Sequence, residues 1–382
     1  MDYLKLDDEQ QMLMEAVDRF LNKRIKPLYK QYNNVAIPRD VAGQLVKELA
    51  DFGFIAGTVP KDKGGLGLSF RTHGMLIERL SMVFPALAGL VFITSSMAAK
   101  IGREGTDQQY EAYFQRMLSG ELIGAGAITE PAVGSNPAEV TTSATRSGDD
   151  WIINGEKCWI SNGGISDLVV VIARTGPERG NLSRFIVERA DGYSSSDIPK
   201  MAMGEWPTSI MRFDNVRIPA WRQMGRDGSG LMSTLRGFEV ARCYVALLSV
   251  GIAQAALEVA LEYAKQRVQW GKPIGQHQLV QDMLAEMATQ TDAARLLAYR
   301  GLSLVDQGVR CDTQTSMAKW FATEMAVKVT SMAVQIHGAY GISTEYPVER
   351  YFREARILTI PDGTTQIQKL IIGRNLTGLS AF

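Results

Sequence analysis

The spacing of hydrophobic residues divides the chain into three stretches with different periods. In the first stretch, apolar residues recur at helical spacing, as between Met12 and Leu21, and Asp7 or Asp8 can cap this helix. Between about residues 125 and 226 the period becomes that of strands, and helical stripes return from about residue 229. The pattern therefore predicts helices, then strands, then helices again.

Individual elements can be placed within the middle and last stretches. In the middle stretch, Asn154-Gly155 separates two short hydrophobic segments and predicts a hairpin turn. Three further segments bounded by Gly and Pro have the length of strands and cover residues 168–173, 185–187 and 210–218. In the last stretch, apolar stripes at helical spacing begin at Ala253, Met283 and Ala318. These stripes favour an up-down bundle of long helices.

The length of 382 residues exceeds what one compact core usually holds and predicts two or three domains. We expect an α+β multidomain chain. Its parts would be an N-terminal α-helical domain (1–124), a small middle β-barrel or β-sandwich domain (125–228) and a C-terminal four-helix-bundle domain (229–382).

Charge and cysteine content argue against several classes of protein. The 41 basic residues balance 41 acidic ones, which argues against a nucleic-acid-binding protein. Cys158, Cys243 and Cys311 are widely spaced, which fits free thiols in a reducing compartment and predicts no metal site. The N-terminus has no targeting pattern, and the longest apolar run, near residues 86–93, is short for a membrane span. We expect a soluble, cytoplasmic protein.

Three segments carry candidate chemistry. Residues 360–368 place one carboxylate, Asp362, on a Pro/Gly turn before a helix start, where it could accept a proton from a substrate. An ordinary helix-capping Asp-Gly turn is the alternative. Residues 128–136 and 157–163 supply hydroxyl groups and an aromatic ring that could flank a planar heterocycle, although each could equally be surface turn chemistry. No Gly-rich dinucleotide motif follows a strand.

Taken together and in this order, the segments strongly resemble the acyl-CoA dehydrogenases over nearly the whole chain. The matching segments are TEPxxGS at 129–135, KxWISNG at 157–163, QRVQWGKPI at 266–274, QIHGAYG at 335–341 and DGTTQIQ at 362–368. The resemblance implies a homotetramer that binds FAD between the β-domain and the bundle and desaturates an acyl-CoA thioester at its α,β-bond. It also implies that Asp362 is the catalytic base.

The resemblance further implies roles for individual residues. FAD contacts are implied for Ile128, Thr129, Ser135, Trp159, Ser161, Thr364 and Gln366. Contacts to the FAD of a neighbouring subunit are implied for Arg267, Trp270, Gln278, Gln335, Gly338 and Ala339. Contacts to the acyl-CoA are implied for Phe92, Ser135, Phe238, Arg242 and Gly363.

Several positions depart from the family's pattern. Most members carry Glu at the base position, and the shorter Asp362 retracts the carboxylate by roughly 1 Å, which can cost about 100-fold in rate. Some branches place the base on the bundle helix just before the family's arginine. That position is Ala241 here, and Glu239, two residues earlier, is the alternative carboxylate. Ala339 replaces the usual Gly, and Trp270 replaces the more frequent Phe.

The shorter base leads to an expectation about the substrate. A bulky or ring-shaped acyl group could bring its α-carbon closer to Asp362, and Phe92 is large enough to block long chains. We therefore expect a short, branched or alicyclic acyl-CoA, with electrons passed to an electron-transfer flavoprotein. The alternatives on the same scaffold are enoyl-CoA reduction, β-elimination without net oxidation, and a catalytically silent FAD-binding subunit.

Overall fold

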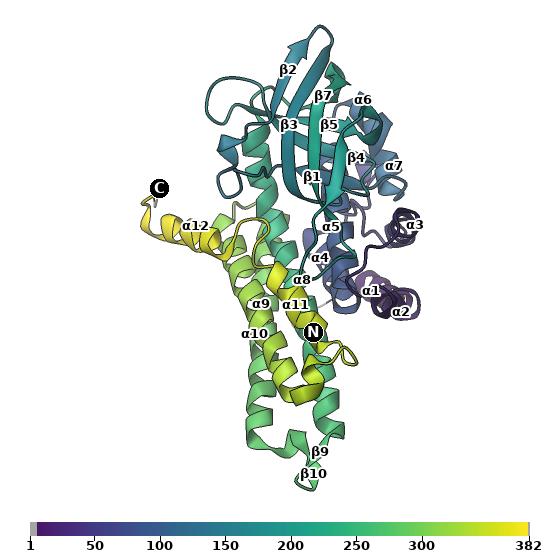
Figure 1. Ribbon diagram of the computed structural model, residues 1–382, viewed down its shortest axis with the longest axis vertical. Helices are drawn as coiled ribbons and strands as arrows, with labels where there is room; N and C mark the ends of the chain where they lie inside the picture. The colour runs from purple at the N-terminus through teal and green to yellow at the C-terminus, as the bar shows by residue number, and fades with distance from the viewer. Residues whose placement is uncertain (1–5, 381–382) are drawn as a thin grey trace. The chain divides into compact units, whose positions relative to one another are not determined.

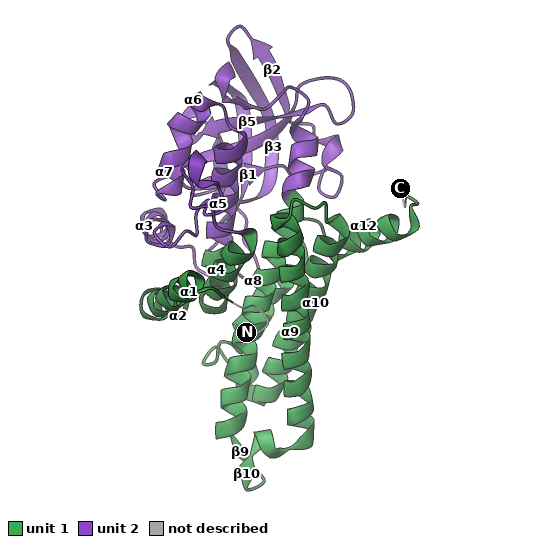
Figure 2. Cartoon of the chain, turned by 180° about the vertical axis from the view of Figure 1, so that it is seen from behind, with its two compact units in different colours: residues 1–31, 70–88, 238–382 green, residues 32–69, 89–237 purple. Residues whose placement is uncertain are grey.

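The computed structural model describes residues 6–380 (Figure 1). The chain divides into two compact units, each assembled from separate segments (Figure 2). Unit 1 comprises Met1–Gln31, Phe70–Ala88 and Phe238–Phe382, and unit 2 comprises Tyr32–Ser69 and Gly89–Gly237. Each unit therefore draws on more than one of the three stretches defined by hydrophobic period.

Unit 1 is built mainly from helices. They are α1 (Asp8–Phe20), α2 (Lys26–Gln31), α4 (Phe70–Val83), most of α8 (Gly230–Gln266), α9 (Gln278–Asp306), α10 (Asp312–His337), α11 (Val348–Ile357) and α12 (Thr365–Thr377). A short hairpin, β9 (Val268–Gln269) and β10 (Lys272–Pro273), joins α8 to α9. At the start of α1, Asp7 and Gln10 form a capping box, so the expected N-terminal cap is confirmed.

The long helices of unit 1 follow the predicted apolar stripes. Within unit 1, α8 contributes buried residues on many sides, as expected for a helix covered by several neighbours. Polar groups buried with them are paired: Arg295 on α9 bonds Glu78 on α4 at 2.7 Å, and Tyr299 donates to the same carboxylate at 2.6 Å. Because of this pairing, α4 and α9 pack together without leaving the buried Glu78 and Arg295 charges unpaired.

Unit 2 combines a mixed sheet with shorter helices. The helices are α3 (Arg39–Ala50), most of α5 (Pro85–Glu104), α6 (Asp107–Gln109) and α7 (Gln115–Leu118). The strands are β1 (Gly124–Ala127), β2 (Ser143–Ser147), β3 (Asp150–Ser161), β4 (Leu168–Arg174), β5 (Leu182–Glu188), β6 (Ser194–Asp197), β7 (Thr208–Pro219) and β8 (Gln223–Met224). The strands predicted at 168–173, 185–187 and 210–218 are thus confirmed as parts of β4, β5 and β7.

The strands run in the order β6-β7-β3-β2-β4-β5-β8, with β1 beside β4. One parallel pair, Ser143 with Arg174, joins the β6-β7-β3-β2 group to the β4-β5-β8 group. The two groups share one hydrophobic core, in which Trp151 of β3 meets Phe185 of β5 edge to face at 5.2 Å between ring centroids. The small β-domain predicted from the sequence is confirmed, together with the helical segments on either side of it.

The hairpin predicted at Asn154-Gly155 is wrong. These residues lie inside the continuous strand β3, and the β2–β3 turn falls at Gly148-Asp149. Gly155 has φ 147° and lies at a shift of register between β3 and β7, where a Cβ atom would come within 2.5 Å of the Thr142 hydroxyl oxygen. Asn154 accepts a hydrogen bond from the backbone N–H of Asn215 at 2.8 Å. The pair therefore forms a β-bulge, which requires the same residue types as a turn.

Two helices, α5 and α8, are long and apolar enough to cross a membrane, and 78% of the relevant stretch of each is buried within the protein. Core helices of soluble proteins have the same length and composition, so these properties alone assign no membrane span. Cys158 in unit 2 and Cys243 and Cys311 in unit 1 are free and buried. Between residues 6 and 380, no group of three or more His, Cys, Asp or Glu side chains is arranged to hold a metal ion.

Candidate active site

In unit 2, the structure brings Thr129 and Trp159 together. Thr129 follows β1, and its carbonyl oxygen accepts a hydrogen bond from the Cys158 N–H at 2.9 Å. The next residue, Trp159, lies at a second shift of register between β3 and β7, with φ 59° and 58% of its surface exposed. A left-handed backbone is rare for a bulky residue, and an exposed indole forgoes burial, so this bulge leaves a flat aromatic face open to solvent.

A buried ion pair between Glu130 and Lys157 connects the segment that contains Thr129 to the strand that contains Trp159. Lys157 donates to the Glu130 carboxylate at 2.9 Å and to the Ile128 carbonyl at 2.9 Å. Backbone N–H groups of Thr141 and Thr142 each donate to Glu130 at 2.8 Å. Burial alone would raise the pKa of Glu130, but the Lys157 charge and these hydrogen bonds lower it to about 2. Burial also lowers the pKa of Lys157 to about 8, against the opposing effect of the Glu130 charge.

Asn162 fixes the end of β3, where Ser161 is the last residue. Its buried side chain, at φ 65°, donates to the carbonyl oxygens of Leu90 on α5 and Gly124 on β1, both at 3.0 Å. It also accepts a hydrogen bond from the Trp206 indole at 3.0 Å. Asn162 therefore anchors the backbone next to Ser161; it lies within the 157–163 segment, but the sequence predicted no role for it.

The other predicted residues of unit 2 lie on separate elements. Phe92 is on α5 and is 3% exposed, two residues beyond the Leu90 carbonyl that Asn162 binds. Ser135 is exposed in the loop after β1, and Ile128 is half-buried.

In unit 1, Asp362 occupies the turn between α11 and α12 and has φ 55°. Lys319 on α10 donates to the carbonyl oxygens of Thr359 at 3.0 Å and Gly363 at 2.9 Å. Gln368 donates to the carbonyls of Asp362 at 3.0 Å and Gly363 at 2.9 Å. Thr364 caps α12, so the carboxylate-bearing turn does lead directly into a helix, as predicted.

Two cationic side chains, Arg242 and Lys319, interact electrostatically with Asp362 on this turn. Arg242 on α8 is buried, bonds Asp312 at 3.4 Å, and its Nε has no hydrogen-bond partner among the described residues. Burial lowers the pKa of Arg242, whereas the charges of Asp312, Asp362 and Glu239 oppose that shift. Burial likewise lowers the pKa of Lys319 to about 8, with the Asp362 charge acting in the opposite direction. Asp362 therefore lies within the electrostatic reach of two cations.

The alternative carboxylate, Glu239, interacts with Cys311 and Asp312. It accepts a hydrogen bond from the Cys311 N–H at 3.5 Å, and burial together with the neighbouring Asp312 charge raises its pKa. Phe238 is half-buried beside it on α8, four residues before Arg242 and hence on the same side of the helix.

The residues implied to contact a neighbour's FAD gather at one end of the bundle. Arg267 follows α8 and lies over the Tyr340 ring, 5.8 Å from its centroid. Trp270, at the tip of the β9–β10 hairpin, is 92% exposed, and Gln278 begins α9. Gln335 is exposed near the end of α10.

Gly338 and Ala339 follow α10 in the short helix η8 (Gly338–Ile342), and Gly338 has φ 60°. Gln335 is 16 positions beyond Lys319 on α10, which is about 24 Å along the helix. This end of the bundle is therefore far from Asp362 of the same chain.

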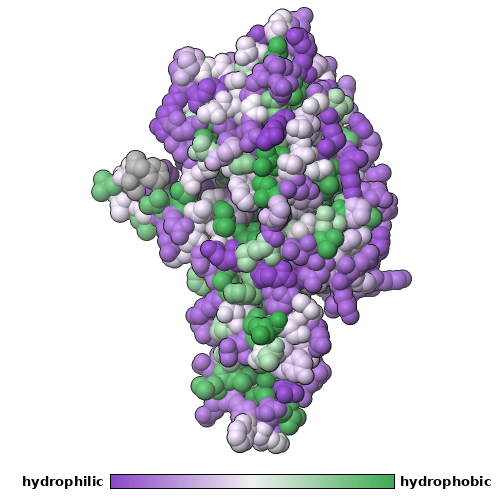
Figure 3. Space-filling model, viewed as in Figure 1, coloured by the Kyte–Doolittle hydropathy of each residue, from purple (hydrophilic) through white to green (hydrophobic). Residues whose placement is uncertain are grey.

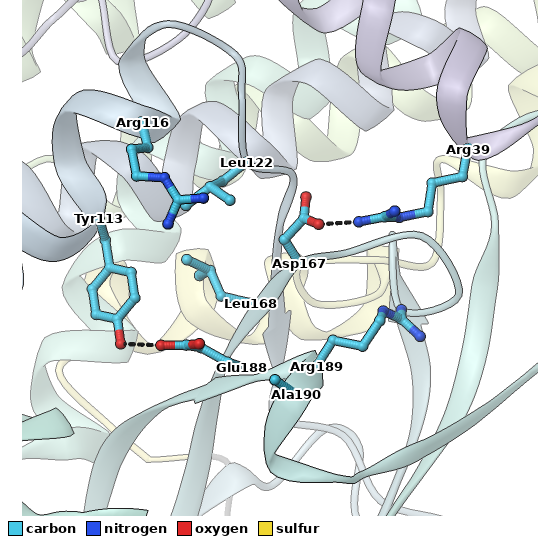
Figure 4. Close-up of a pocket in the computed structure, with 9 residues that line it drawn as sticks. All are labelled: Arg39, Tyr113, Arg116, Leu122, Asp167, Leu168, Glu188, Arg189 and Ala190. Carbon is cyan, nitrogen blue, oxygen red and sulfur yellow. Dashed lines mark hydrogen bonds and ion pairs between the residues drawn. The ribbon is translucent and has the colours of Figure 1, made fainter.

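A separate pocket of about 350 Å³ lies in unit 2 (Figure 4). It is lined by Arg39, Tyr113, Arg116, Leu122, Asp167, Leu168, Glu188, Arg189 and Ala190. Its charges are engaged within the protein: Arg39 pairs with Asp167, and Tyr113 donates to Glu188 at 2.7 Å. None of the predicted site residues lines this pocket, which is a polar depression distinct from the segments above.

Three family models match consecutive parts of the chain. They describe the acyl-CoA dehydrogenase N-terminal domain at residues 7–121, the middle domain at 125–216 and the C-terminal domain at 228–377. The chain belongs to the acyl-CoA dehydrogenase family. The protein is therefore a flavin-dependent oxidoreductase that acts on the CH–CH group of acyl-CoA thioesters.

Relatives of this acyl-CoA dehydrogenase differ in their named substrates. An acyl-CoA dehydrogenase of Bacillus subtilis is 35% identical over 98% of this chain and 100% of its own length. A cyclohex-1-ene-1-carbonyl-CoA dehydrogenase of Syntrophus aciditrophicus is 36% identical, covering 97% and 91% of the two chains. A subunit of the caffeyl-CoA reductase–Etf complex of Acetobacterium woodii is 33% identical, covering 92% and 97%.

Two solved structures superpose closely on this chain. Butyryl-CoA dehydrogenase from Megasphaera elsdenii has a TM-score of 0.93 and 32% identity, covering 98% of this chain and 99% of its own. The FAD complex of PigA has a TM-score of 0.91 and 28% identity, with coverages of 98% and 99%. The cofactor of this acyl-CoA dehydrogenase is FAD. The exposed indole of Trp159, held beside the Thr129 segment, fits the ring of that cofactor.

Proposed function

We propose that Asp362 is the base of an α,β-desaturation of a short, branched or alicyclic acyl-CoA. The observation that carries this proposal is the position of its carboxylate. It lies on a turn at the N-terminus of α12, within electrostatic reach of Arg242 and Lys319. Both cations and the helix dipole favour the ionised form of a carboxylate, which is the form that accepts a proton.

On this proposal, residues of unit 1 have the following roles in the reaction. Asp362 would take the α-proton of the thioester, and the electron pair of that C–H bond would form the new α,β double bond as the β-hydrogen leaves with its own pair. When bound, FAD accepts the β-hydrogen as a hydride. The buried Arg242, whose Nε lacks a partner among the described residues, is the group we assign to an oxygen of the acyl-CoA.

The residues of unit 2 would bind the cofactor and limit the acyl group. We assign Trp159, Thr129 and Ser161 to the flavin ring, with the Glu130–Lys157 pair holding their segments in place. The buried Phe92 would limit the length of the acyl chain. Each methylene that fits contributes about 0.8 kcal/mol, so a blocked pocket discriminates steeply against longer chains.

The experiment is rapid mixing of the enzyme with straight, branched and cyclic acyl-CoAs while flavin reduction is followed. Asp362→Asn should keep FAD and thioester binding but slow reduction by about 10²- to 10⁴-fold, because only proton transfer is lost. Asp362→Glu should slow ring-shaped and branched substrates and favour straight chains. Palmitoyl-CoA as the best substrate, or an unimpaired Asp362→Asn variant, would contradict the proposal.

A second candidate is the reverse direction, reduction of an enoyl-CoA. Two observations favour keeping it: the base is the shorter aspartate, and one relative is a subunit of a caffeyl-CoA reductase–Etf complex. In either direction we propose an electron-transfer flavoprotein as the redox partner. Reoxidation of the reduced enzyme by enoyl-CoAs, compared with reduction of the oxidised enzyme by the matching acyl-CoAs, distinguishes the two directions.

We also propose that the enzyme is a homotetramer in which Arg267 and Gln278 contact a neighbour's FAD. Large exposed hydrophobic side chains support this proposal: Val268, Trp270, Leu279, Ile342, Leu376 and Leu379. Figure 3 shows hydrophobic surface over the bundle and α12, and such surface usually marks an interface. Light scattering tests the mass, and Arg267→Ala should lower FAD content. A monomer that retains FAD would contradict this arrangement.

A further inference from the structure

The turn that carries Asp362 is held by two fully buried side chains from different helices. Lys319 on α10 and Gln368 on α12 are both 0% exposed. Together they donate four hydrogen bonds of 2.9–3.0 Å to the carbonyl oxygens of Thr359, Asp362 and Gly363. Two side chains thus fix three carbonyls within five residues of backbone.

The backbone of this turn is one that needs such support. Asp362 has φ 55° and Gly363 has φ 90°, so two consecutive residues are left-handed. Aspartate adopts the left-handed conformation more readily than most residues but still uncommonly. Such a backbone persists where several surrounding contacts hold it in place. A Cβ atom at position 363 would lie 2.6 Å from Gln368 Nε2, which shows how closely Gln368 is packed against the turn.

We infer that Lys319 and Gln368 are positioning residues for the base: their hydrogen bonds to the carbonyls set where the Asp362 carboxylate lies. This inference rests on the proposed function of Asp362. The aspartate is one methylene shorter than glutamate, so less side-chain freedom is left to correct a displaced backbone. Because a displacement of about 1 Å at a reacting group can cost about 100-fold, movement of this turn would slow proton transfer severely.

Lys319 has a second effect through its charge. Among the described residues its ammonium group donates to carbonyl oxygens and to no carboxylate, so its charge is not neutralised by direct pairing. The other charged groups near this cluster include Arg242 and Glu239 on α8, Asp312 and Glu324 on α10, and Arg356 on α11. Glu324 accepts a hydrogen bond from the Thr365 hydroxyl, and Arg356 donates one to the Thr359 hydroxyl oxygen. Loss of one cation from this set raises the pH at which the carboxylate becomes protonated.

Proton transfer can be measured apart from oxidation. 3,3-Dimethylbutyryl-CoA has α-hydrogens but no β-hydrogen, so its exchange of α-protons with D₂O reports the base alone. Lys319→Met should slow this exchange by about 10- to 100-fold and move the acid limb of its pH profile to higher pH. FAD content and thioester Kd should stay within about threefold of wild type. Lys328→Met is the matched control, because Lys328 lies on the same helix and pairs with Glu286 at the surface.

Gln368→Met separates the geometric effect from the charge effect. It should slow exchange to a similar degree but leave the acid limb in place, because no charge is removed. Amide hydrogen exchange of residues 358–369 should be faster in both variants. If Lys319→Met does not fold, Gln368→Met alone decides the geometric effect, and Lys319→Gln tests the charge.

Two outcomes are distinct. Wild-type exchange in Asp362→Asn would show that the proposed base is wrong. Loss of exchange in Asp362→Asn together with wild-type rates and pH profiles in Lys319→Met and Gln368→Met would overturn the positioning role.

Discussion

Each unit contains a fully buried lysine beside a residue with left-handed backbone, and the two lysines are used differently. In unit 2, Lys157 bonds one carbonyl and the Glu130 carboxylate near Trp159. In unit 1, Lys319 bonds two carbonyls next to Asp362 and, within residues 6–380, no carboxylate. A buried charge in contact with its counter-ion is largely neutralised, so removing either partner is strongly destabilising, whereas a buried charge without a counter-ion exerts a stronger field on its surroundings. The contrast separates a lysine in a buried ion pair from the lysine that we propose positions the base.

The largest expected difference is in folding stability. Lys157→Met leaves the buried Glu130 charge without its partner, which should lower the free energy of unfolding by about 3–5 kcal/mol. Lys319→Met removes an unpaired buried charge along with two hydrogen bonds, so its loss should be about 1–2 kcal/mol. Urea unfolding at one protein and FAD concentration measures both. Equal losses would remove the distinction between the two lysines.

Acid titration should expose the unit 2 pair. The pKa of Glu130 is lowered from 4.5 to about 2 in the folded protein, so its contribution is complete above pH 4.5 and is lost as the pH falls through about 2. The contribution amounts to up to about 3 kcal/mol. Wild type should therefore lose more stability than Glu130→Gln between pH 5 and pH 3. Parallel pH curves for the two proteins would show that the pair is not what acid disrupts.

A double substitution sharpens the structural interpretation. Glu130→Gln with Lys157→Met leaves no charge in the buried pair, so it should be about 1–3 kcal/mol more stable than Lys157→Met alone. The comparison requires Glu130→Gln as the third corner of the cycle. Additive losses across the cycle would mean that the two side chains act independently despite their 2.9 Å contact.

The smallest expected effect lies on the alkaline side. The pKa of Lys319 is lowered from 10.5 to about 8, so unfolded chains bind more protons than folded ones between these values. Its contribution to stability therefore rises as the pH increases from about 8 to 10.5, while its charge beside Asp362 is lost. A neutral Lys319 holds the Thr359 and Gly363 carbonyls by weaker hydrogen bonds, so exchange of α-protons should fall about 2- to 5-fold through pH 8 in wild type but not in Lys319→Met. Identical alkaline limbs would assign the titration to another group.

Most of the fold could be predicted because it follows hydrophobic period. Strands β4, β5 and β7 and the long helices α8, α9 and α10 each contain a predicted segment. The failure at Asn154-Gly155 has a clear physical cause, since a glycine at a bulge and a glycine at a turn satisfy the same backbone requirement. Only the pairing of β3 with β7, which is 58 residues away in sequence at Gly155 and Phe213, distinguishes a bulge from a turn.

The candidate site was likewise only partly predictable from the sequence. Asp362, Thr129 and Trp159 could be found from motifs, but the residues that hold them could not. Lys319 looks like a solvated helix charge in the sequence, and only the packing of α11, α12 and the turn onto α10 shows that it is buried. Glu130 and Lys157 were within the selected segments, and the opposite signs of their charges were the one signal available for their contact.

The three buried thiols can also serve as native probes of local unfolding in the structure around them. Cys158 reports on unit 2, while Cys243 and Cys311 report on unit 1, and all three are at most 6% exposed. A thiol reagent can reach them only when the surrounding structure opens, so the labelling rate of each cysteine measures the free energy of that opening. Mass spectrometry of the labelled peptides would thus compare the breathing of the two units in one sample, without any introduced probe.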